Sequence, residues 1–230
     1  MATYVTGDTH RRFTRLFEFC ETNHTTIEDT LVILGDAGIN IYCDTRDDDK
    51  KNELLNLPVT LLCVHGNHEE RPFLLGYQEK EWKEGMVYYE EKYPHLLFAK
   101  DGEIYDLEGL RAVVIGGAYS VDKWYRLQRG IQWFADEQPS DEIKARVEER
   151  LAAENWQVDA VLTHTCPLRY TPTEAFLSFV DQSSVDNSTE LWLDAIEERL
   201  DYKTWYCGHW HINKRIDKMH FLFEGIEIIE

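Results

Sequence analysis

Several short apolar runs in this chain end in side chains that can bind metals. The run 59–64 leads directly into the polar turn Gly66-Asn67-His68-Glu69. An apolar run of this length, rich in Val and Leu, is typical of a strand that is buried on both faces. A turn uses Gly and Asn for their backbone freedom, but it needs no imidazole and carboxylate after them. This stretch therefore predicts chemistry at the end of a buried strand.

The same arrangement recurs along the chain. Three other strand-like runs end in the turns 8–10, 35–36 and 208–211, and a fourth ends in a histidine. The candidate metal ligands at these five strand ends are Asp8, His10, Asp36, Asn67, His164, His209 and His211. Any one of them alone has an ordinary explanation as a cap or turn residue. Because sites in open α/β sheets form at the carboxyl ends of strands, their joint occurrence predicts one shared metal site.

The order of elements predicts an α/β fold. Strands are expected over 2–6, 30–34 and 59–64, with a charged loop or helix start over 44–53 and a short packed helix around 54–57. Between the first two strands, apolar residues recur at helical spacing at Phe13, Leu16, Phe17 and Cys20. Alternation of strand and helix is typical of a mostly parallel sheet.

The second part of the chain predicts further strands and two helices. Residues 69–94 are charged and aromatic with only weak periodicity. Strands are expected over 96–98, 103–107, 111–115, 158–163 and 204–207, then a closing hairpin over 212–216 and 220–223 and an edge strand over 226–229. Glu108-Gly109 indicates an antiparallel hairpin. Helices are expected over 140–156, capped by Ser140, and 188–200, with its inner face at Leu191, Trp192, Ala195 and Ile196.

Composition restricts the partners. With 230 residues and no repeat or linker, we expect a single domain over residues 1–230. The net charge of −19 argues against long nucleic acids and anionic membranes. It is compatible with a small phosphorylated substrate, because bound divalent metals reverse the local charge.

The cysteines and the apolar runs bear on location. Five scattered cysteines without a C-x-x-C pair are typical of free thiols in a reducing compartment. No signal peptide is recognisable at the start, and no apolar run reaches the length of a membrane span. We therefore expect a cytoplasmic protein.

The ligand types indicate which metals would bind. Asp8 and His10 are two residues apart, as are His209 and His211, so each pair would point to one side of an extended strand. Imidazole and carboxylate together favour Mn, Fe, Zn, Co or Ni over Ca or Mg. Seven ligands exceed what one ion with an open position needs. They suit two divalent ions about 3.5–4 Å apart, with a bridging water or hydroxide as the nucleophile at phosphorus. We expect Mn.

Two residues beside the ligands have separate predicted roles. His68 follows a ligand directly, so its side chain should face elsewhere, where it can protonate a leaving alkoxide or stabilise the transition state. Glu69 is expected to support a ligand, for example by orienting a histidine.

Together, Asp8-x-His10, Gly35-Asp36, Gly66-Asn67-His68-Glu69, His164 and Gly208-His209-x-His211 resemble the motif set of the calcineurin-like metallophosphoesterase superfamily. The resemblance spans residues 8–211. It implies a four-layer α/β/β/α sandwich of two mixed sheets flanked by helices, with the metal site at the carboxyl ends of the strands, and His68 as the catalytic histidine. It also implies that one metal is held by Asp8, His10, Asp36 and His211, and that the other is held by Asp36, Asn67, His164 and His209.

One motif departs from part of the family. The second motif continues as Ala37-Gly38, so the phosphate-gripping arginine of the protein phosphatases is absent there. This argues against a phosphoprotein phosphatase. Arg11 and Arg12 after His10 are candidate substitutes for binding substrate, and Arg126 and Arg129 are alternatives that the sequence leaves open.

Two functions follow from the sequence. The first is hydrolysis of a phosphate monoester or diester, with a small phosphorylated molecule such as a nucleotide as substrate. The alternative is a non-catalytic metal-binding scaffold of the same fold that binds a protein partner. The aromatic segments 82–93 and 119–134 are open to three interpretations, which are core, a lid that stacks a nucleobase, and the interface of a homo-oligomer.

Overall fold

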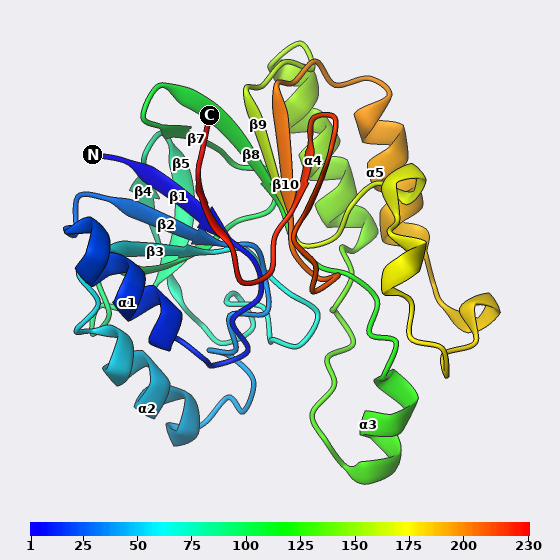
Figure 1. The fold of residues 1–230 in the computed structure, drawn as a ribbon, viewed down its shortest axis with the longest axis horizontal. Helices are drawn as coiled ribbons and strands as arrows, with labels where there is room; N and C mark the ends of the chain where they lie inside the picture. The colour runs from blue at the N-terminus through cyan, green and yellow to red at the C-terminus, as the bar shows by residue number, and fades with distance from the viewer.

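Two β-sheets packed face to face form the centre of the molecule, which a computed structural model describes over residues 1–230 (Figure 1). The first sheet has seven strands. In spatial order they are β13 (Ile226–Ile228), β1 (Thr3–Thr6), β2 (Thr30–Ile33), β3 (Thr60–Cys63), β6 (Leu96–Ala99), β5 (Gly85–Tyr89) and β4 (Gln78–Trp82). Strands β1, β2, β3 and β6 are parallel, whereas β13, β5 and β4 run antiparallel to their neighbours.

The second sheet has six strands. In spatial order they are β11 (Lys214–Ile216), β12 (Met219–Phe221), β10 (Thr204–Cys207), β9 (Ala160–Thr163), β8 (Leu110–Ile115) and β7 (Ile104–Leu107). The central pairs β12–β10, β10–β9 and β9–β8 are parallel, and the outer pairs β11–β12 and β7–β8 are antiparallel. The expected hairpin at Glu108-Gly109 is confirmed.

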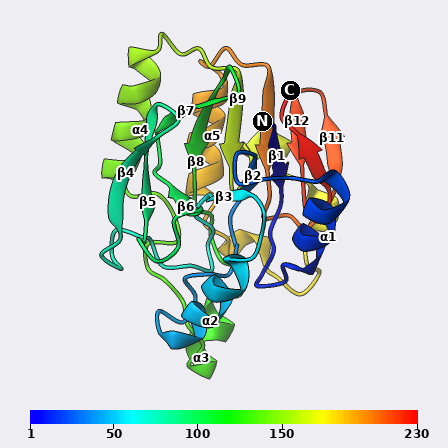
Figure 2. The ribbon, with the colours of Figure 1, turned by 90° about the vertical axis from the view of Figure 1, so that its left-hand side faces the viewer.

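Helices cover the outer face of each sheet. Helices α1 (Thr14–Asn23) and α2 (Thr45–Leu54) pack on the first sheet, and α4 (Asp141–Ala153) and α5 (Ser188–Glu197) pack on the second (Figure 1). The short helix α3 (Lys123–Arg129) extends away from the sheets (Figure 2). The four-layer α/β/β/α sandwich of two mixed sheets is therefore confirmed.

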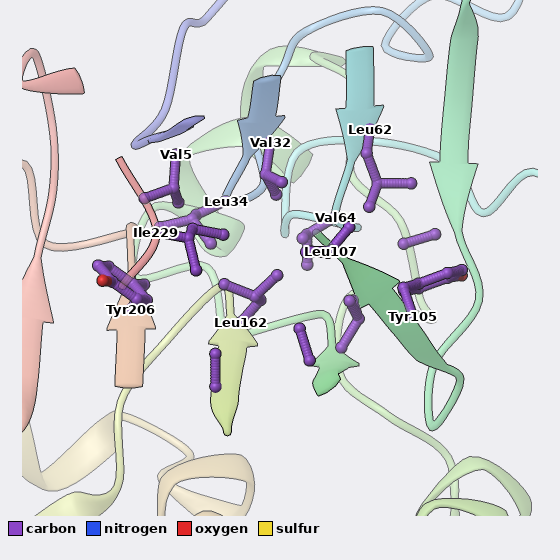
Figure 3. Close-up of a cluster of buried hydrophobic side chains, with 14 of the residues drawn as sticks. Val5, Val32, Leu34, Leu62, Val64, Tyr105, Leu107, Leu162, Tyr206 and Ile229 are labelled. Carbon is purple, nitrogen blue, oxygen red and sulfur yellow. The ribbon is translucent and has the colours of Figure 1, made fainter. Parts of the chain in front are cut away.

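Alternation along the strands builds three cores. On β2, Val32 faces the core between the sheets, while Leu31 and Ile33 face α1 and α2. In the core between the sheets, side chains from β1 to β3 meet those of the second sheet, such as Leu162 and Tyr206 (Figure 3). Because both faces of these strands are buried, their sequences are continuously apolar instead of alternating.

Three expected elements differ in the structure. Residues 69–94 contain the hairpin β4–β5, which the weak periodicity did not indicate because β4 is polar and lies at the edge of its sheet. Helix α2 occupies the charged stretch and ends at Leu54, so the packed helix expected around 54–57 is wrong; Leu55 is exposed. Residues 121–139 include α3 instead of being loop throughout.

The expected inner face of α5 is partly wrong. Leu191 and Ala195 are exposed, and Leu193 and Ile196 are buried against the second sheet. The polar residue Glu190 is also buried on this helix. The helix therefore presents a different face to the sheet from the one that the apolar residues alone suggested.

All five cysteines are free thiols, and all except Cys43 are buried. None of the helices combines the length and apolar character that crossing a bilayer requires.

Candidate metal centre

The ends of five strands from both sheets meet at one place. Asp8 follows β1, Asp36 follows β2 and Asn67 follows β3, all in the first sheet. From the second sheet, His164 follows β9 directly, and the pair His209 and His211 follows β10. Six of the seven side chains that the sequence singled out form two neighbouring groups of three, and Asp36 lies between them.

The first group contains Asp8, His10 and His211, whose potential ligand atoms lie within 4.8 Å of one another. His211 Nε2 is 3.2 Å from Asp8 Oδ2, and His10 Nε2 is 3.6 Å from the same oxygen. The two histidine Nε2 atoms are only 2.9 Å apart. Two nitrogen lone pairs at this distance repel each other, so the arrangement needs a proton or a cation between them.

The second group contains Asn67, His164 and His209. Asn67 Oδ1 lies 2.7 Å from His164 Nε2 and 3.0 Å from His209 Nδ1. His164 is fully buried, and its Nδ1 lies 2.8 Å from the carbonyl oxygen of Leu34. That contact fixes the ring orientation and leaves Nε2 to face the site, as the outer-shell partners of metal-binding histidines do.

Asp36 lies between the two groups. Its Oδ2 is 3.9 Å from His10 Nδ1, and its Oδ1 is 3.9 Å from His164 Nε2. Asp36 Oδ1 also accepts a hydrogen bond from the backbone N–H of His68 at 2.9 Å. A carboxylate in this position reaches both groups at once.

Left-handed backbone conformations aim these side chains. Four of the seven candidate ligands have positive φ, namely His10 (45°), Asp36 (47°), His209 (64°) and His211 (52°). β1 and β10 end before the ligand pairs, so these turns, and not alternation along a strand, bring each pair together. Such conformations cost about 1–3 kcal/mol each and cluster at functional sites.

Close approach of side chains to glycines completes the geometry. A Cβ on Gly66 would lie 2.1 Å from Asp36 Oδ1, and one on Gly35 would lie 2.1 Å from His164 Nδ1. The glycines of the two motifs are therefore required because ligand side chains occupy the space beside them.

The pKa shifts of three candidate ligands favour the protonation states that bind metals. Burial lowers the pKa of His209 to about 3, helped by neighbouring His164, and burial also lowers the pKa of His10. Burial works to raise the pKa of Asp36, but His68 and the other nearby histidines outweigh it and lower that pKa. Metals need neutral imidazole and ionised carboxylate, and His209, His10 and Asp36 provide both, whereas the hydrogen bond with Asp8 raises the pKa of His211. The donor set therefore fits divalent metal ions.

A family model described as calcineurin-like phosphoesterase matches residues 1–213. The chain belongs to this family. Two solved structures have the same fold. One, a crystal structure of the protein TT1561 of Thermus thermophilus, has a TM-score of 0.50 and 11% identity, with 91% of this chain and 82% of that chain covered. A second has a TM-score of 0.53 and 13% identity, with 96% and 88% covered. No curated protein matches the sequence.

In this calcineurin-like phosphoesterase, His68 stands beside the ligands and faces a pocket. Its Nε2 is 3.2 Å from Asn67 Nδ2 and 3.9 Å from Asp36 Oδ2. Its side chain is 19% exposed. His68 is therefore the site histidine with the least involvement in either ligand group, and it is open to a bound molecule.

The four candidate arginines occupy different places. Arg126 on α3 reaches the site, with Nη2 at 3.4 Å from His68 Nε2 and Nε held by Asp122 Oδ2 at 2.8 Å. Arg11 instead donates to Asp47 at 2.6 Å and to backbone carbonyls. Arg12 is exposed beside a separate hollow, and Arg129 lies over the ring of Tyr125. Among these four, Arg126 is the one positioned next to His68.

Two supporting residues have contacts that the sequence did not indicate. Ser120 Oγ accepts a hydrogen bond from Asn67 Nδ2 at 2.8 Å, which directs the Asn67 oxygen toward the histidines. Glu69 is buried and orients no histidine; the backbone N–H groups of Ala37 and Gly38 lie at its carboxyl, next to Asp36. Burial, together with the charge of Asp36, raises the pKa of Glu69 to about 8.

Proposed function

We propose that this protein is a hydrolase that cleaves phosphate esters with two bound divalent metal ions. The observation that carries the proposal is the convergence of seven ligand side chains from five strand ends beside His68. The family supports hydrolysis at phosphorus. The group of Asp8, His10 and His211 and the neighbouring group of Asn67, His164 and His209 support two ions.

The residues divide between the ions as the two groups suggest. Asp8, His10 and His211 would hold one ion; Asn67, His164 and His209 would hold the other; and Asp36 lies where it can serve both. When bound, such ions supply charge neutralisation at phosphorus and a water nucleophile of lowered pKa. We infer Mn because mixed nitrogen and oxygen ligands suit it.

His68 and Arg126 act on the substrate. Asp36 accepts a hydrogen bond from the backbone N–H of His68, and this contact holds the backbone that carries the His68 ring. His68 lines the pocket, where its ring can donate a proton to the leaving oxygen. The Arg126 guanidinium beside it can bind a phosphate oxygen, a role that suits its planar fork of donors.

The substrate is inferred to be small. The net charge of −19 repels long nucleic acids over most of the surface. Among the four candidate arginines, Arg126 is the one next to His68. Its positive charge can therefore attract a phosphate at the site although the protein as a whole is acidic. The buried free thiols support a reducing, cytoplasmic setting.

The test is reconstitution with Mn, followed by measurement of bound metal per chain and of turnover. One phosphomonoester and one phosphodiester with a nitrophenolate leaving group would be compared. We expect about two ions per chain, turnover of at least one substrate, and a loss of about 10²–10⁴-fold in kcat for His68→Ala with metal content unchanged. The exposed His24→Ala is the matched control and should retain full activity.

Two results would contradict the proposal. Two bound ions without turnover of any phosphoester would favour the non-catalytic scaffold that binds a protein partner. Unchanged metal content in His164→Ala would show that the ligand assignment is wrong.

A further inference from the structure

The site opens into a pocket with more lining than a phosphate group alone would contact. The cavity has a volume of about 300 Å³. Its lining consists of site residues, including His68, Asp36 and His209, and of a wall formed by Val121, Trp210 and the segment 175–190. In Figure 1 this segment, in yellow, runs beside α5 at the end of the molecule where α3 lies. The pocket therefore extends from the candidate ligands and His68 to side chains that have no part in metal binding.

That wall is largely apolar and aromatic. The rings of Phe176 and Trp210 have centroids 6.1 Å apart and planes inclined at 32°. Val121, Val180 and Val185 complete the lining around them. None of these five side chains is a buried core residue, although Trp210 packs in part against the outer core of the second sheet. Their apolar surface is available to a flat, apolar part of a bound molecule.

Two buried polar atoms in this wall have no partner in the protein. Glu190 is 4% exposed, and its Oε1 accepts a hydrogen bond from Thr165 at 2.9 Å, whereas Oε2 has none. The indole Nε1 of Trp210 is also buried and unpaired. A buried polar atom left unpaired costs about 1–3 kcal/mol. Glu190 and Trp210 both line the pocket, so one acceptor and one donor without a protein partner belong to its lining residues.

Building on the proposed function, we propose that this pocket binds the base of a nucleotide ester. The base lies against the wall formed by Phe176 and Trp210, offers an N–H to Glu190 Oε2 and accepts from Trp210 Nε1, while its phosphate stands at His68. An aliphatic chain would leave both polar atoms unpaired, and a sugar offers no flat apolar face. At about 300 Å³ the cavity is at the small end of ligand sites and suits one nucleoside.

Binding of adenosine tests the pocket without any chemistry. Adenosine carries no phosphate, so calorimetry and tryptophan fluorescence report on the pocket alone, with or without Mn. We expect saturable binding that weakens at least tenfold in Phe176→Ala and in Glu190→Gln. Leu191→Ala is the matched control, because Leu191 is exposed on the same helix and does not line the pocket. Phe176 lies outside the cores, so that variant decides the question if Glu190→Gln fails to fold.

Kinetics of the Mn-loaded protein separate this inference from the proposed function. We expect kcat/KM for adenosine 5′-monophosphate to exceed that for methyl phosphate at least tenfold, mainly through KM, and Phe176→Ala to reduce the ratio. No adenosine binding, or equal binding in wild type and Phe176→Ala, would overturn the pocket assignment even if both esters are hydrolysed. Adenosine binding without hydrolysis of any ester would refute the proposed function and leave the pocket assignment standing.

Discussion

At the scale of single residues, the site depends on backbone positions where a side chain does not fit. Gly35 illustrates this, because it combines a φ of +92° with the ring of His164 directly where a Cβ would be. The left-handed conformation and the close approach are separate constraints. A second glycine with nearly the same φ but open surroundings, Gly109 at +86°, allows them to be distinguished.

We predict that Gly35→Ala abolishes metal binding and that Gly109→Ala does not. Both variants place alanine in a left-handed conformation, which costs about 1–2 kcal/mol. Only Gly35→Ala must also displace His164, since its Cβ would lie 2.1 Å from Nδ1. Urea unfolding and metal content of both variants check this. Equal metal content in the two variants would show that the space beside Gly35 does not matter.

A second prediction concerns the buried carboxyl of Glu69. Its pKa is raised from the ordinary 4.5 to about 8, first by burial and then by the charge of Asp36. The folded protein therefore keeps this proton after the unfolded chain has lost it. The stability that results is fully present below pH 4.5 and is lost as the pH rises toward 8. For one proton the slope is at most about 1.4 kcal/mol per pH unit.

Removing the titrating group should flatten this dependence. In metal-free protein we expect Glu69→Gln to lose less unfolding free energy than wild type between about pH 5 and pH 8, as measured by urea unfolding at several pH values. Glu28→Gln, at an exposed position, is the control and should follow the wild-type curve. Parallel curves for Glu69→Gln and wild type would contradict the assigned pKa.

The residues that the sequence singled out share one property. Each ligand lies directly after an apolar run, so its place at a strand end follows from local pattern. Ser120, Arg126 and Glu190 reach the same site from distant loops and helices. Nothing in the immediate sequence of Ser120 or Glu190 distinguishes them from surface residues, and Arg126 was one of four arginines among which the sequence did not decide, because only the tertiary fold brings these side chains to the ligands.

At the scale of elements, periodicity located α5 but not its buried face. The predicted face was Leu191, Trp192, Ala195 and Ile196. Ile196 and, in part, Trp192 do pack on the second sheet, but Leu191 and Ala195 are exposed and Leu193 is buried instead. The buried Glu190 explains part of the difference, since its carboxyl lines the pocket beside His68 and so turns a charged position inward. A similar limit applies to β4, whose polar edge strand carries no alternating pattern.

The packing of α5 leads to a prediction with an internal control. We expect Leu193→Ala to lower the free energy of unfolding by about 2–5 kcal/mol, because Leu193 is 1% exposed within the outer core of the second sheet. Leu191→Ala, at a position that is 56% exposed, should change it by no more than about 0.5 kcal/mol. Urea unfolding of the two variants measures both. A larger loss of unfolding free energy in Leu191→Ala than in Leu193→Ala would contradict this packing and support the face that the sequence suggested.

At the scale of the whole molecule, the candidate metal centre lies where the two sheets meet. Asp8, Asp36 and Asn67 come from the first sheet, and the histidines after β9 and β10 come from the second. The sheets already share an apolar core (Figure 3). The order of strand and helix along the sequence predicted a mostly parallel sheet, whereas the second sheet and the four layers were implied by the resemblance to the family. Metal ions would add a second connection between the layers.

Metal loading should therefore stabilise the folded protein as a whole. An ion that binds only the folded state contributes about 2.7 kcal/mol at a concentration 100-fold above its Kd, which for a chain of this size raises Tm by about 5–10 °C. We expect Mn to produce this shift, EDTA to remove it, and Asp36→Asn to reduce it most, since Asp36 reaches both ligand groups. Asp159→Asn, which loses a surface ion pair with Lys203, should retain the full shift even if its starting Tm is lower. Scanning calorimetry at matched metal concentrations makes the comparison. An equal shift in Asp36→Asn and Asp159→Asn would mean that Mn stabilises the protein from somewhere other than the junction of the two sheets.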